Sequence, residues 1–355
     1  MDEVAESARS APRKALVLAA GFGTRLRPLT NLLPKPLVPV AGVPLISFSL
    51  RLLARAGIEE VMINLHHLPD VVEAKLGRRA EGMKLHYSRE ASILGTGGGI
   101  RKVASFFDET FLVMNADAIL DADLNAAIET HHRMGAIATM VVRPRQKDAP
   151  FSVVGVDDEG RVRQIADRIE YDGPPLAPHV FTGVHIMEPE LLDYIPPDIE
   201  SCINAYAYPK VIKADRVVAA HVYDGFWADV GTLERYWQVN SDFLRRRVQL
   251  QSFDLLAEIG NAPRKDVDDV IRLGDKCTLG AGVRLEPPVI VADGARIADG
   301  AEVGPEVVVG SNASIGKGAR VMRAILLDGA KVEASAEIRD EVVTRKGRIP
   351  LHSEG

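Results

Sequence analysis

The chain has 355 residues, which is long enough for two domains with full hydrophobic cores. Its 46% hydrophobic and 26% charged residues are ordinary for a globular protein, and no apolar run approaches the ~20 residues that a membrane-spanning helix needs. A formal net charge of −6 gives no general reason to expect binding to nucleic acid or to an anionic membrane.

Cysteine usage and the N-terminus both bear on where the protein works. Cys202 and Cys277 are too few for a disulfide framework, which favours a reducing compartment. Residues 1–12 are polar and small, without the apolar core of a signal peptide. We therefore expect a cytoplasmic protein with a flexible tail over residues 1–12.

The first element is a short apolar run, residues 15–20, which predicts a buried parallel strand. Gly21 and Gly23 follow at once, where the backbone can turn sharply and bring its N–H groups close to a ligand. Arg25 and Lys35 add positive charge beside that backbone. Amides and cations together would complete the oxygen shell of a polyphosphate.

Two better-known glycine loops are excluded here. A dinucleotide-binding fingerprint needs a third glycine where Leu26 stands, and a Walker-type loop needs Gly-Lys followed by Ser or Thr, which is absent after this strand. The full pattern Gly-x-Gly-Thr-Arg-Leu-x-Pro-Leu-Thr, with a downstream Pro-Lys-Pro, is far more specific. It resembles the sugar-1-phosphate nucleotidylyltransferases, the enzymes that make nucleotide sugars, and the resemblance runs from about Lys14 to Arg245.

The elements that follow alternate between helix and strand. Apolar spacing predicts a helix over residues 45–56, a buried strand over 61–65 and a short helix over 70–76. This rhythm indicates a parallel sheet with right-handed crossovers. His66 and His67 close the second strand, and we expect them to pack and to form hydrogen bonds in a loop rather than to bind a metal.

Three consecutive glycines, residues 97–99, precede a helix predicted over residues 100–107. At a helix N-terminus they would let a base or a phosphate lie against the backbone. The family has a similar element bordering the nucleoside, which implies that Gly95 lies at the base and that Glu90 reads it. A carboxylate could accept from two donors of guanine or from the single donor of uracil or thymine, which favours guanine and leaves the others open.

A further apolar strand is predicted over residues 110–114 and ends in Asn115-Ala-Asp117. A carboxylate at the carboxyl edge of a parallel strand stands where ligands bind. The alternative is a helix cap, but Asp121 and Asp123 are better placed for capping.

Asp229 is a second carboxylate, before a glycine turn and a helix predicted over residues 233–245, and alone it could equally be a cap. The resemblance implies that Asp117 and Asp229 are the two metal-holding aspartates of the family. It also implies that Asn115 contacts the nucleotide. Two carboxylates suffice for Mg²⁺ when substrate phosphates supply further ligands.

Between these aspartates the sequence predicts a helix over residues 124–134, with His131 and His132 facing solvent, and then a hairpin formed by residues 151–157 and 161–165. The hairpin belongs to the part of the chain that should face the sugar.

Sugar-phosphate binding is expected just after this hairpin. Asp167-Arg168 stands where the family carries Glu-Lys-Pro, so the pair either binds the sugar phosphate or forms a surface ion pair. Phe-Thr-Gly-Val, with Thr182 and Gly183, resembles the turn that lines the family's sugar pocket.

The C-terminal part of the chain, from Leu273 on, has a sequence repeat with a period of six residues. Apolar residues recur at every sixth position, namely Leu273, Leu279, Leu285, Val291, Ile297, Val303, Val309, Ile315, Val321 and Leu327. This is the hexapeptide pattern of a β-helix, so we expect about three triangular coils, with a slipped end at Val332 and Ile338. Acyl transfer usually needs a histidine base, and the sequence contains no histidine between His221 and His352. We therefore interpret this C-terminal repeat as structural, oligomerising or regulatory.

The predicted organisation is therefore an α/β protein in four parts: the tail (1–12), a Rossmann-like mixed-sheet nucleotidyltransferase domain (13–250), a linker (251–269) and a left-handed parallel β-helix (270–346). We expect a homo-oligomer assembled through the β-helix.

The resemblance implies that a sugar 1-phosphate attacks the α-phosphorus of a nucleoside triphosphate and pyrophosphate leaves. Catalysis is then a matter of charge and position, with Arg25 and Lys35 as catalytic cations and Mg²⁺ as cofactor. The residues expected on the nucleotide are Ala20, Gly21, Gly23, Thr24, Arg25, Glu90, Gly95 and Asn115.

GTP and mannose 1-phosphate are the favoured substrates. The alternatives are a uridylyl- or thymidylyltransferase acting on another sugar 1-phosphate of MurNAc, glucose or heptose type, a catalytically silent homologue that binds nucleotide sugar, and an oligomeric scaffold that works through the β-helix. A redox enzyme is excluded mainly by Leu26.

Overall fold

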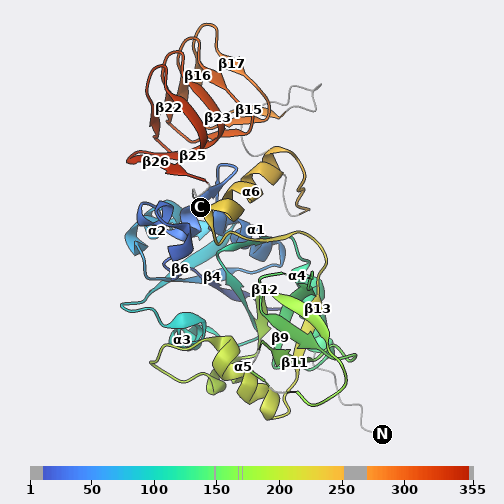
Figure 1. The fold of residues 1–355 in the computed structure, drawn as a ribbon. Helices are drawn as coiled ribbons and strands as arrows, with labels where there is room; N and C mark the ends of the chain where they lie inside the picture. The colour runs from blue at the N-terminus through green and yellow to red at the C-terminus, as the bar shows by residue number, and fades with distance from the viewer. Residues whose placement is uncertain (1–10, 148, 167, 170, 252–269, 352–355) are drawn as a thin grey trace. The chain divides into compact units, whose positions relative to one another are not determined.

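A computed structural model describes residues 11–147, 149–166, 168–169, 171–251 and 270–351, and Figure 1 draws its fold. Contacts divide the chain into two compact units. The first combines Met1–Phe22 with Ile46–Trp227, and the second combines Gly23–Leu45 with Ala228–Gly355. Of the predicted tail and linker, residues 1–10 and 252–269 lie outside the described residues, and the predicted domain boundaries stay predictions.

The first unit is built on a ten-stranded mixed sheet. Its parallel centre has the order β7, β1, β4, β6. β12 then continues the sheet antiparallel to β7. The strands of this sheet are β1 (Lys14–Leu18), β4 (Glu60–Leu65), β5 (Arg79–Ala80), β6 (Met83–Arg89), β7 (Phe111–Asn115), β9 (Ala138–Pro144), β10 (Val153–Val156), β11 (Val162–Ile165), β12 (Ala177–Met187) and β13 (Val218–Val222). The mixed α/β sheet and the hairpin of β10 and β11 are as predicted.

Helices connect and cover these strands, because their apolar stripes need a sheet face for burial. They are α1 (Leu45–Arg55), α2 (Pro69–Leu76), α3 (Gly95–Lys102), α4 (Leu124–Arg133) and α5 (Ile203–Lys213), with the 3₁₀ turns η4 (Ala104–Phe106) and η5 (Pro189–Tyr194). A short strand, β8 (Ala118–Leu120), follows β7. Buried Leu16, Phe111, Val113, Met140 and Tyr208 belong to the core on which these elements pack.

The helix predicted over residues 100–107 is wrong in its start and its end. α3 begins at Gly95 and ends at Lys102, and the turn η4 occupies the second half of the range predicted as helix. The three glycines are therefore inside the helix rather than before it, and each of them is buried. Tertiary packing overrides their low helix propensity, as described for the site below.

The prediction that His131 faces solvent is also wrong. Its side chain is fully buried at the C-terminal end of α4, where Nδ1 lies 2.9 Å from Thr139 Oγ1 and Nε2 lies 3.2 Å from Glu188 Oε1. Both ring nitrogens have partners in the interior, which removes the cost of burying them. His132 is half-buried.

The second unit contains the loop segment after β1 and a coil of short parallel strands. The loop has three 3₁₀ turns, η1 (Thr24–Leu26), η2 (Leu29–Asn31) and η3 (Lys35–Leu37), and the small hairpin of β2 (Pro39–Val40) and β3 (Val43–Pro44). The helix α6 (Leu233–Leu244) follows β14 (Trp227–Asp229) and precedes the coil.

The coil strands stack in steps of one rung. Ile271 pairs with Val289 and Val289 with Val307, each 18 residues on, whereas Val307 pairs with Ala324, 17 residues on. Three hexads make one such rung, consistent with the predicted β-helix. The register shifts by one residue before Ala324, earlier than the slip predicted at Val332, so Leu326 rather than the predicted Leu327 pairs with Val309. The strands are β15 (Ile271–Leu273), β16 (Thr278–Leu279), β17 (Arg284–Leu285), β18 (Val289–Val291), β19 (Arg296–Ile297), β20 (Glu302–Val303), β21 (Val307–Val309), β22 (Ser314–Ile315), β23 (Arg320–Leu326), β24 (Lys331–Val332), β25 (Glu337–Thr344) and β26 (Gly347–Pro350). Their inward Val, Ile and Ala side chains form the coil's own core.

Among the described helices, none combines the length and the apolar character that crossing a membrane requires.

Candidate active site

In the first unit, the loop after β1 is fixed at the carboxyl edge of the parallel sheet. Asn64, near the end of β4, is 2% exposed, and its Oδ1 accepts a hydrogen bond of 2.7 Å from the Ala19 N–H. Ala116 N–H, just after β7, donates to Leu18 O at 3.0 Å. Ala20 and Gly21 follow directly, Ala20 buried and Gly21 exposed. Because neighbouring parallel strands end at one edge, Ala20 and Gly21 come close to the ends of β4 and β7.

Glu90 lies at the same edge and is 5% exposed. Its Oε1 accepts from Asn64 Nδ2 at 2.7 Å and its Oε2 accepts from the Leu94 N–H at 3.1 Å. The Glu90 carbonyl lies 2.9 Å from His66 Nδ1, and the His66 ring meets the exposed Phe22 edge to face. The packing and hydrogen bonding predicted for His66 are confirmed. The carboxylate of Glu90 orders the loop that leads to Gly95.

The glycines of α3 are required by close backbone packing. Gly95 has φ +67°, and a Cβ added there would lie 2.6 Å from the Ser201 carbonyl oxygen. A Cβ at Gly98 would lie 2.6 Å from the Ile199 carbonyl oxygen, and one at Gly99 would lie 2.7 Å from Asn64 Nδ2. Contacts this short do not occur for real side chains, so these positions need glycine. The loop before α5 is thereby held against α3.

A second cluster of the first unit surrounds the end of β7. Gly183 has φ +98° in a bulge of β12, and a Cβ there would lie 3.1 Å from Asn115 Cβ. Thr182 is 1% exposed and donates from Oγ1 to the Val141 carbonyl at 2.8 Å. The Thr182 carbonyl accepts from Trp227 Nε1 at 2.8 Å. Asn115, Thr182 and Gly183, from motifs identified in the sequence, are brought together with Trp227.

Asp117 is half-buried in the short connection between β7 and β8. The helix-capping alternative belongs to Asp123, as predicted, because its Oδ1 accepts from the N–H groups of Asn125 and Ala126 at 3.0 and 3.2 Å. Asp121 instead lies 3.6 Å from Arg55 in an ion pair.

In the second unit, Gly23 joins the two halves of its loop. It has φ +61°, and a Cβ there would lie 2.9 Å from Thr30 Cγ2 and 3.1 Å from Lys35 Cβ. Thr30 Oγ1 donates to the Gly23 carbonyl at 2.8 Å. Lys35 is 8% exposed, and its stem packs against the glycine turn. The predicted loop cations are thus tied to the glycine turn, with Thr24 and Arg25 exposed beside it.

Asp229 meets the same loop within the second unit. A Cβ at Gly231 would lie 2.8 Å from Asp229 Oδ2 and 3.0 Å from Arg25 Nη2, so both side chains lie against the Gly231 backbone. Arg235 Nη1 donates to Asp229 Oδ2 at 2.7 Å. Thr232 caps α6 by accepting from the Arg235 N–H at 3.2 Å, which leaves Asp229 outside the capping role considered for it.

The predicted sugar-phosphate pair is only partly described. Asp167 lies outside the described residues. Arg168 is exposed, and its backbone N–H donates to the Ile165 carbonyl at 3.0 Å, just after β11. The choice between phosphate binding and a surface ion pair therefore stays a prediction.

Sequence reasoning missed two residues of this arrangement, Asn64 and Arg235. A signal existed for each of them. Asn64 is the one amide in the apolar strand β4 and lies at its carboxyl end, and Arg235 lies in the first turn of α6, six residues after Asp229.

The donor set fits a hard divalent cation. Carboxylate oxygens are the ligands that Mg²⁺ prefers, and it is commonly bound by one or two of them together with substrate phosphates. Within the described part of the chain, no group of three or more His, Cys, Asp or Glu side chains could hold a metal. An ion held by two aspartates would take its other ligands from water and from substrate phosphates.

Comparison with known families gives this site its context. The family described as nucleotidyl transferase matches residues 14–246, and the GMPPB C-terminal domain matches residues 285–352. The chain belongs to the nucleotidyl transferase family, whose members typically use a divalent metal ion.

Two curated relatives show how far the similarity extends. A mannose-1-phosphate guanylyltransferase of Mycobacterium tuberculosis is 33% identical over 91% of this chain and 82% of its own length. A UTP–glucose-1-phosphate uridylyltransferase of Synechocystis is 34% identical over 66% of this chain, which spans 64% of that relative, a little under two thirds. The solved structure of HddC from Yersinia pseudotuberculosis matches 65% of this chain and 99% of its own with a TM-score of 0.55 at 21% identity, which supports the fold.

Proposed function

We propose that this protein transfers a nucleotidyl group from a nucleoside triphosphate to a sugar 1-phosphate and releases pyrophosphate, with GTP and mannose 1-phosphate as substrates. One observation carries the proposal: Arg25 and Asp229, about 200 residues apart, lie against the same glycine, Gly231. A cation on a glycine turn beside a half-buried carboxylate suits a triphosphate with a divalent ion better than it suits an uncharged ligand.

The chemistry asks for position and charge rather than for a base. An oxygen of the sugar phosphate, already an anion, attacks the α-phosphorus in line, and the bond from that phosphorus to the pyrophosphate oxygen breaks. In this proposal the turn at Gly21 and Gly23, with Thr24 and Arg25, binds the β- and γ-phosphates. Lys35 neutralises charge near the α-phosphorus, where the bonds change.

Asp117 and Asp229 are proposed to hold Mg²⁺, which supplies charge neutralisation between the two anionic substrates when bound. The resemblance of both motifs to those of the family supports this pairing. Within the first unit, Trp227 Nε1 donates to the Thr182 carbonyl, beside Gly183, which lies against Asn115.

The choice of GTP and mannose 1-phosphate rests on the guanylyltransferase relative, which matches 91% of this chain. Glu90 supports base recognition in this proposal by fixing the loop that leads to Gly95, and a direct contact with the base stays a prediction. The Synechocystis relative favours one second candidate, a uridylyltransferase that uses glucose 1-phosphate. The proposed setting is the cytoplasm, and the proposed assembly is a homo-oligomer through the coil.

A matrix of turnover assays tests the function. Four nucleoside triphosphates are each combined with mannose, glucose, MurNAc or heptose 1-phosphate and Mg²⁺, and pyrophosphate release is measured. GTP with mannose 1-phosphate should give the highest kcat/KM. A maximum at UTP with glucose 1-phosphate would establish the second candidate instead. Nucleotide-sugar binding in a thermal shift assay, without pyrophosphate release from any pair, would identify a silent homologue.

A further inference from the structure

One helix of the second unit connects the coil to the residues proposed to act on the triphosphate. The first turn of α6 carries Arg235, which binds Asp229. The other end carries Ser241 and Arg245, which contact the coil. Ser241 lies six residues after Arg235 along the helix, a rise of about 9 Å. A stiff helix of that length transmits a displacement at one end to the other.

The middle of α6 holds the segment that follows Lys35. Tyr236 donates from its hydroxyl to the Pro39 carbonyl at 2.8 Å. Asn240 is fully buried, and its Oδ1 accepts from the Ala41 N–H at 2.7 Å. Both partners lie at the β2–β3 hairpin, next to the turn η3 that begins at Lys35. Lys35 and Asp229 are therefore both supported by α6.

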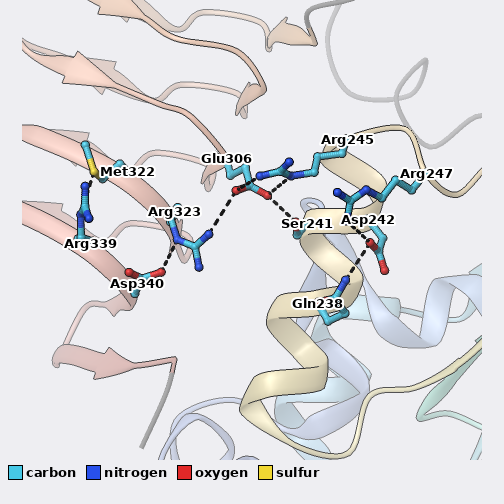
Figure 2. A network of polar contacts seen from close by, with 10 residues as sticks. All are labelled: Gln238, Ser241, Asp242, Arg245, Arg247, Glu306, Met322, Arg323, Arg339 and Asp340. Carbon is cyan, nitrogen blue, oxygen red and sulfur yellow. Dashed lines mark hydrogen bonds and ion pairs between the residues drawn. The ribbon is translucent and has the colours of Figure 1, made fainter. Parts of the chain in front are cut away.

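A buried carboxylate of the coil binds α6. Glu306 is 2% exposed and accepts from Arg245 Nε at 2.7 Å and from Arg245 Nη2 at 2.8 Å, and it also accepts from the Ser241 hydroxyl. Arg323 Nη1 lies 3.7 Å away, and its guanidinium stacks over the Trp237 ring of α6 at 5.4 Å. Figure 2 shows Glu306 reaching from a coil corner toward α6, with Ser241, Arg245 and Arg323 around it.

The corner that presents Glu306 differs from the next one along the coil. Three residues separate Val303 from Val307, whereas two separate Val321 from Ala324, its partner positions one rung on. The corner of Glu306 has the same three residues as the corner before it, between Leu285 and Val289, and Glu306 takes φ +58° there. A buried carboxylate is costly unless it is fully paired, so this corner is a specific attachment and not an incidental surface contact.

We propose that Glu306 is a positioning residue for the transfer reaction: through Ser241 and Arg245 it fixes α6, and α6 fixes Asp229 and the Lys35 segment. The coil thereby completes the catalytic unit, beyond the structural, oligomerising or regulatory roles considered for it. The inference about rate rests on the proposed function, whereas the inference about α6 does not.

Hydrogen exchange of the full-length protein tests the positioning directly. Glu306→Ala is compared with wild type and with Glu302→Ala, a matched control whose carboxylate is half-exposed on the same coil and pairs only at its surface. In the Glu306 variant, the amides of Ala41 and Arg235, which bond to Asn240 and Thr232, should exchange at least about ten-fold faster than in wild type or in the control. Wild-type exchange at both amides in a folded Glu306→Ala protein would overturn the proposal.

Steady-state kinetics with the best substrate pair give the second readout. The same substitution should lower kcat by about ten- to a hundred-fold with KM for both substrates changed less than about two-fold, since small misplacements of positioned groups act mainly on the chemical step. Glu306→Gln keeps an acceptor without the charge and should recover part of the loss. An unchanged kcat in both variants would refute the effect on rate. If wild type itself releases no pyrophosphate, the proposed function fails, and the exchange experiment still decides the role of Glu306.

Discussion

At the residue scale, a small set of contacts shapes the loop after β1, the proposed phosphate site. Gly23 needs its left-handed conformation and leaves no room for a Cβ between Thr30 and Lys35. Packing of its stem against the turn therefore restricts the conformations of the Lys35 side chain. This arrangement favours a role in positioning charge at one atom of the substrate.

Lys35→Met tests that role. Methionine retains the packing of the stem and removes the charge, so kcat should fall by about a hundred-fold or more while the dissociation constant of the nucleotide changes only a few-fold. Rapid-quench turnover and calorimetric titration measure the two quantities. Lys75→Met, on an exposed position of α2, is the control. Near-normal turnover of the Lys35 variant would contradict the assignment.

Some residues of this site could be predicted from the sequence and others could not. The residues of motifs, such as Arg25, Asp117 and Asp229, stand out because their types and spacings are unusual. Asn64 and Arg235 do not, since one amide in a strand and one arginine in a helix are common, and only the folded chain shows which partners they meet.

At the scale of the element, α3 illustrates packing that outweighs local preference. From the sequence, its glycines predict a loop before a helix, because glycine disfavours helical backbone. The backbone carbonyls of Ile199 and Ser201 approach so closely that no larger residue fits, and the helix forms around this contact. A single sequence does not reveal an approach between segments 100 residues apart.

Gly98→Ala tests that explanation through the sign of its effect. In an ordinary helix interior the change stabilises by about 0.5–1 kcal/mol. Here the added carbon meets a carbonyl oxygen at 2.6 Å, so we expect a loss of about 1–3 kcal/mol in the free energy of unfolding measured with urea. Gly21→Ala, where nothing lies within 4 Å, should leave that free energy nearly unchanged. A more stable Gly98 variant would show that the contact is not rigid.

The attachment of α6 to the coil has its own pH dependence. Hydrogen bonds from Arg245 hold the pKa of the Glu306 carboxyl below its ordinary value of 4.5. Because the pKa is lower in the folded than in the unfolded protein, the ionised carboxylate stabilises the fold at pH values above the unfolded-state pKa. This contribution is lost as the pH falls below about 4.5. Wild type should therefore be more stable than Glu306→Gln at pH 7, and the difference in Tm should shrink progressively between pH 4.5 and pH 2.5. A difference that stays constant to pH 2.5 would mean that the charge of Glu306 does not contribute.

At the scale of the whole molecule, the division of the chain does not follow the order of the sequence. The segment Gly23–Leu45, from the middle of the first βαβ motif, groups with the coil rather than with the sheet that precedes it. The sheet, the coil and the family could be predicted from periodicity and motifs. This grouping could not, because it depends on how one helix, α6, packs against the β2–β3 hairpin and a coil corner.

The central claim is that Asp117 and Asp229 share one divalent ion with a bound triphosphate. Electron paramagnetic resonance of Mn²⁺ with a non-hydrolysable GTP analogue measures bound metal in wild type, Asp117→Asn, Asp229→Asn and the double variant, with Asp193→Asn on an exposed turn as control. If the ion is shared, each single substitution should weaken binding by about ten-fold or more, and the double variant should be far less impaired than the product of the two. Independent, multiplicative losses, or a single variant that binds Mn²⁺ like wild type, would contradict the account.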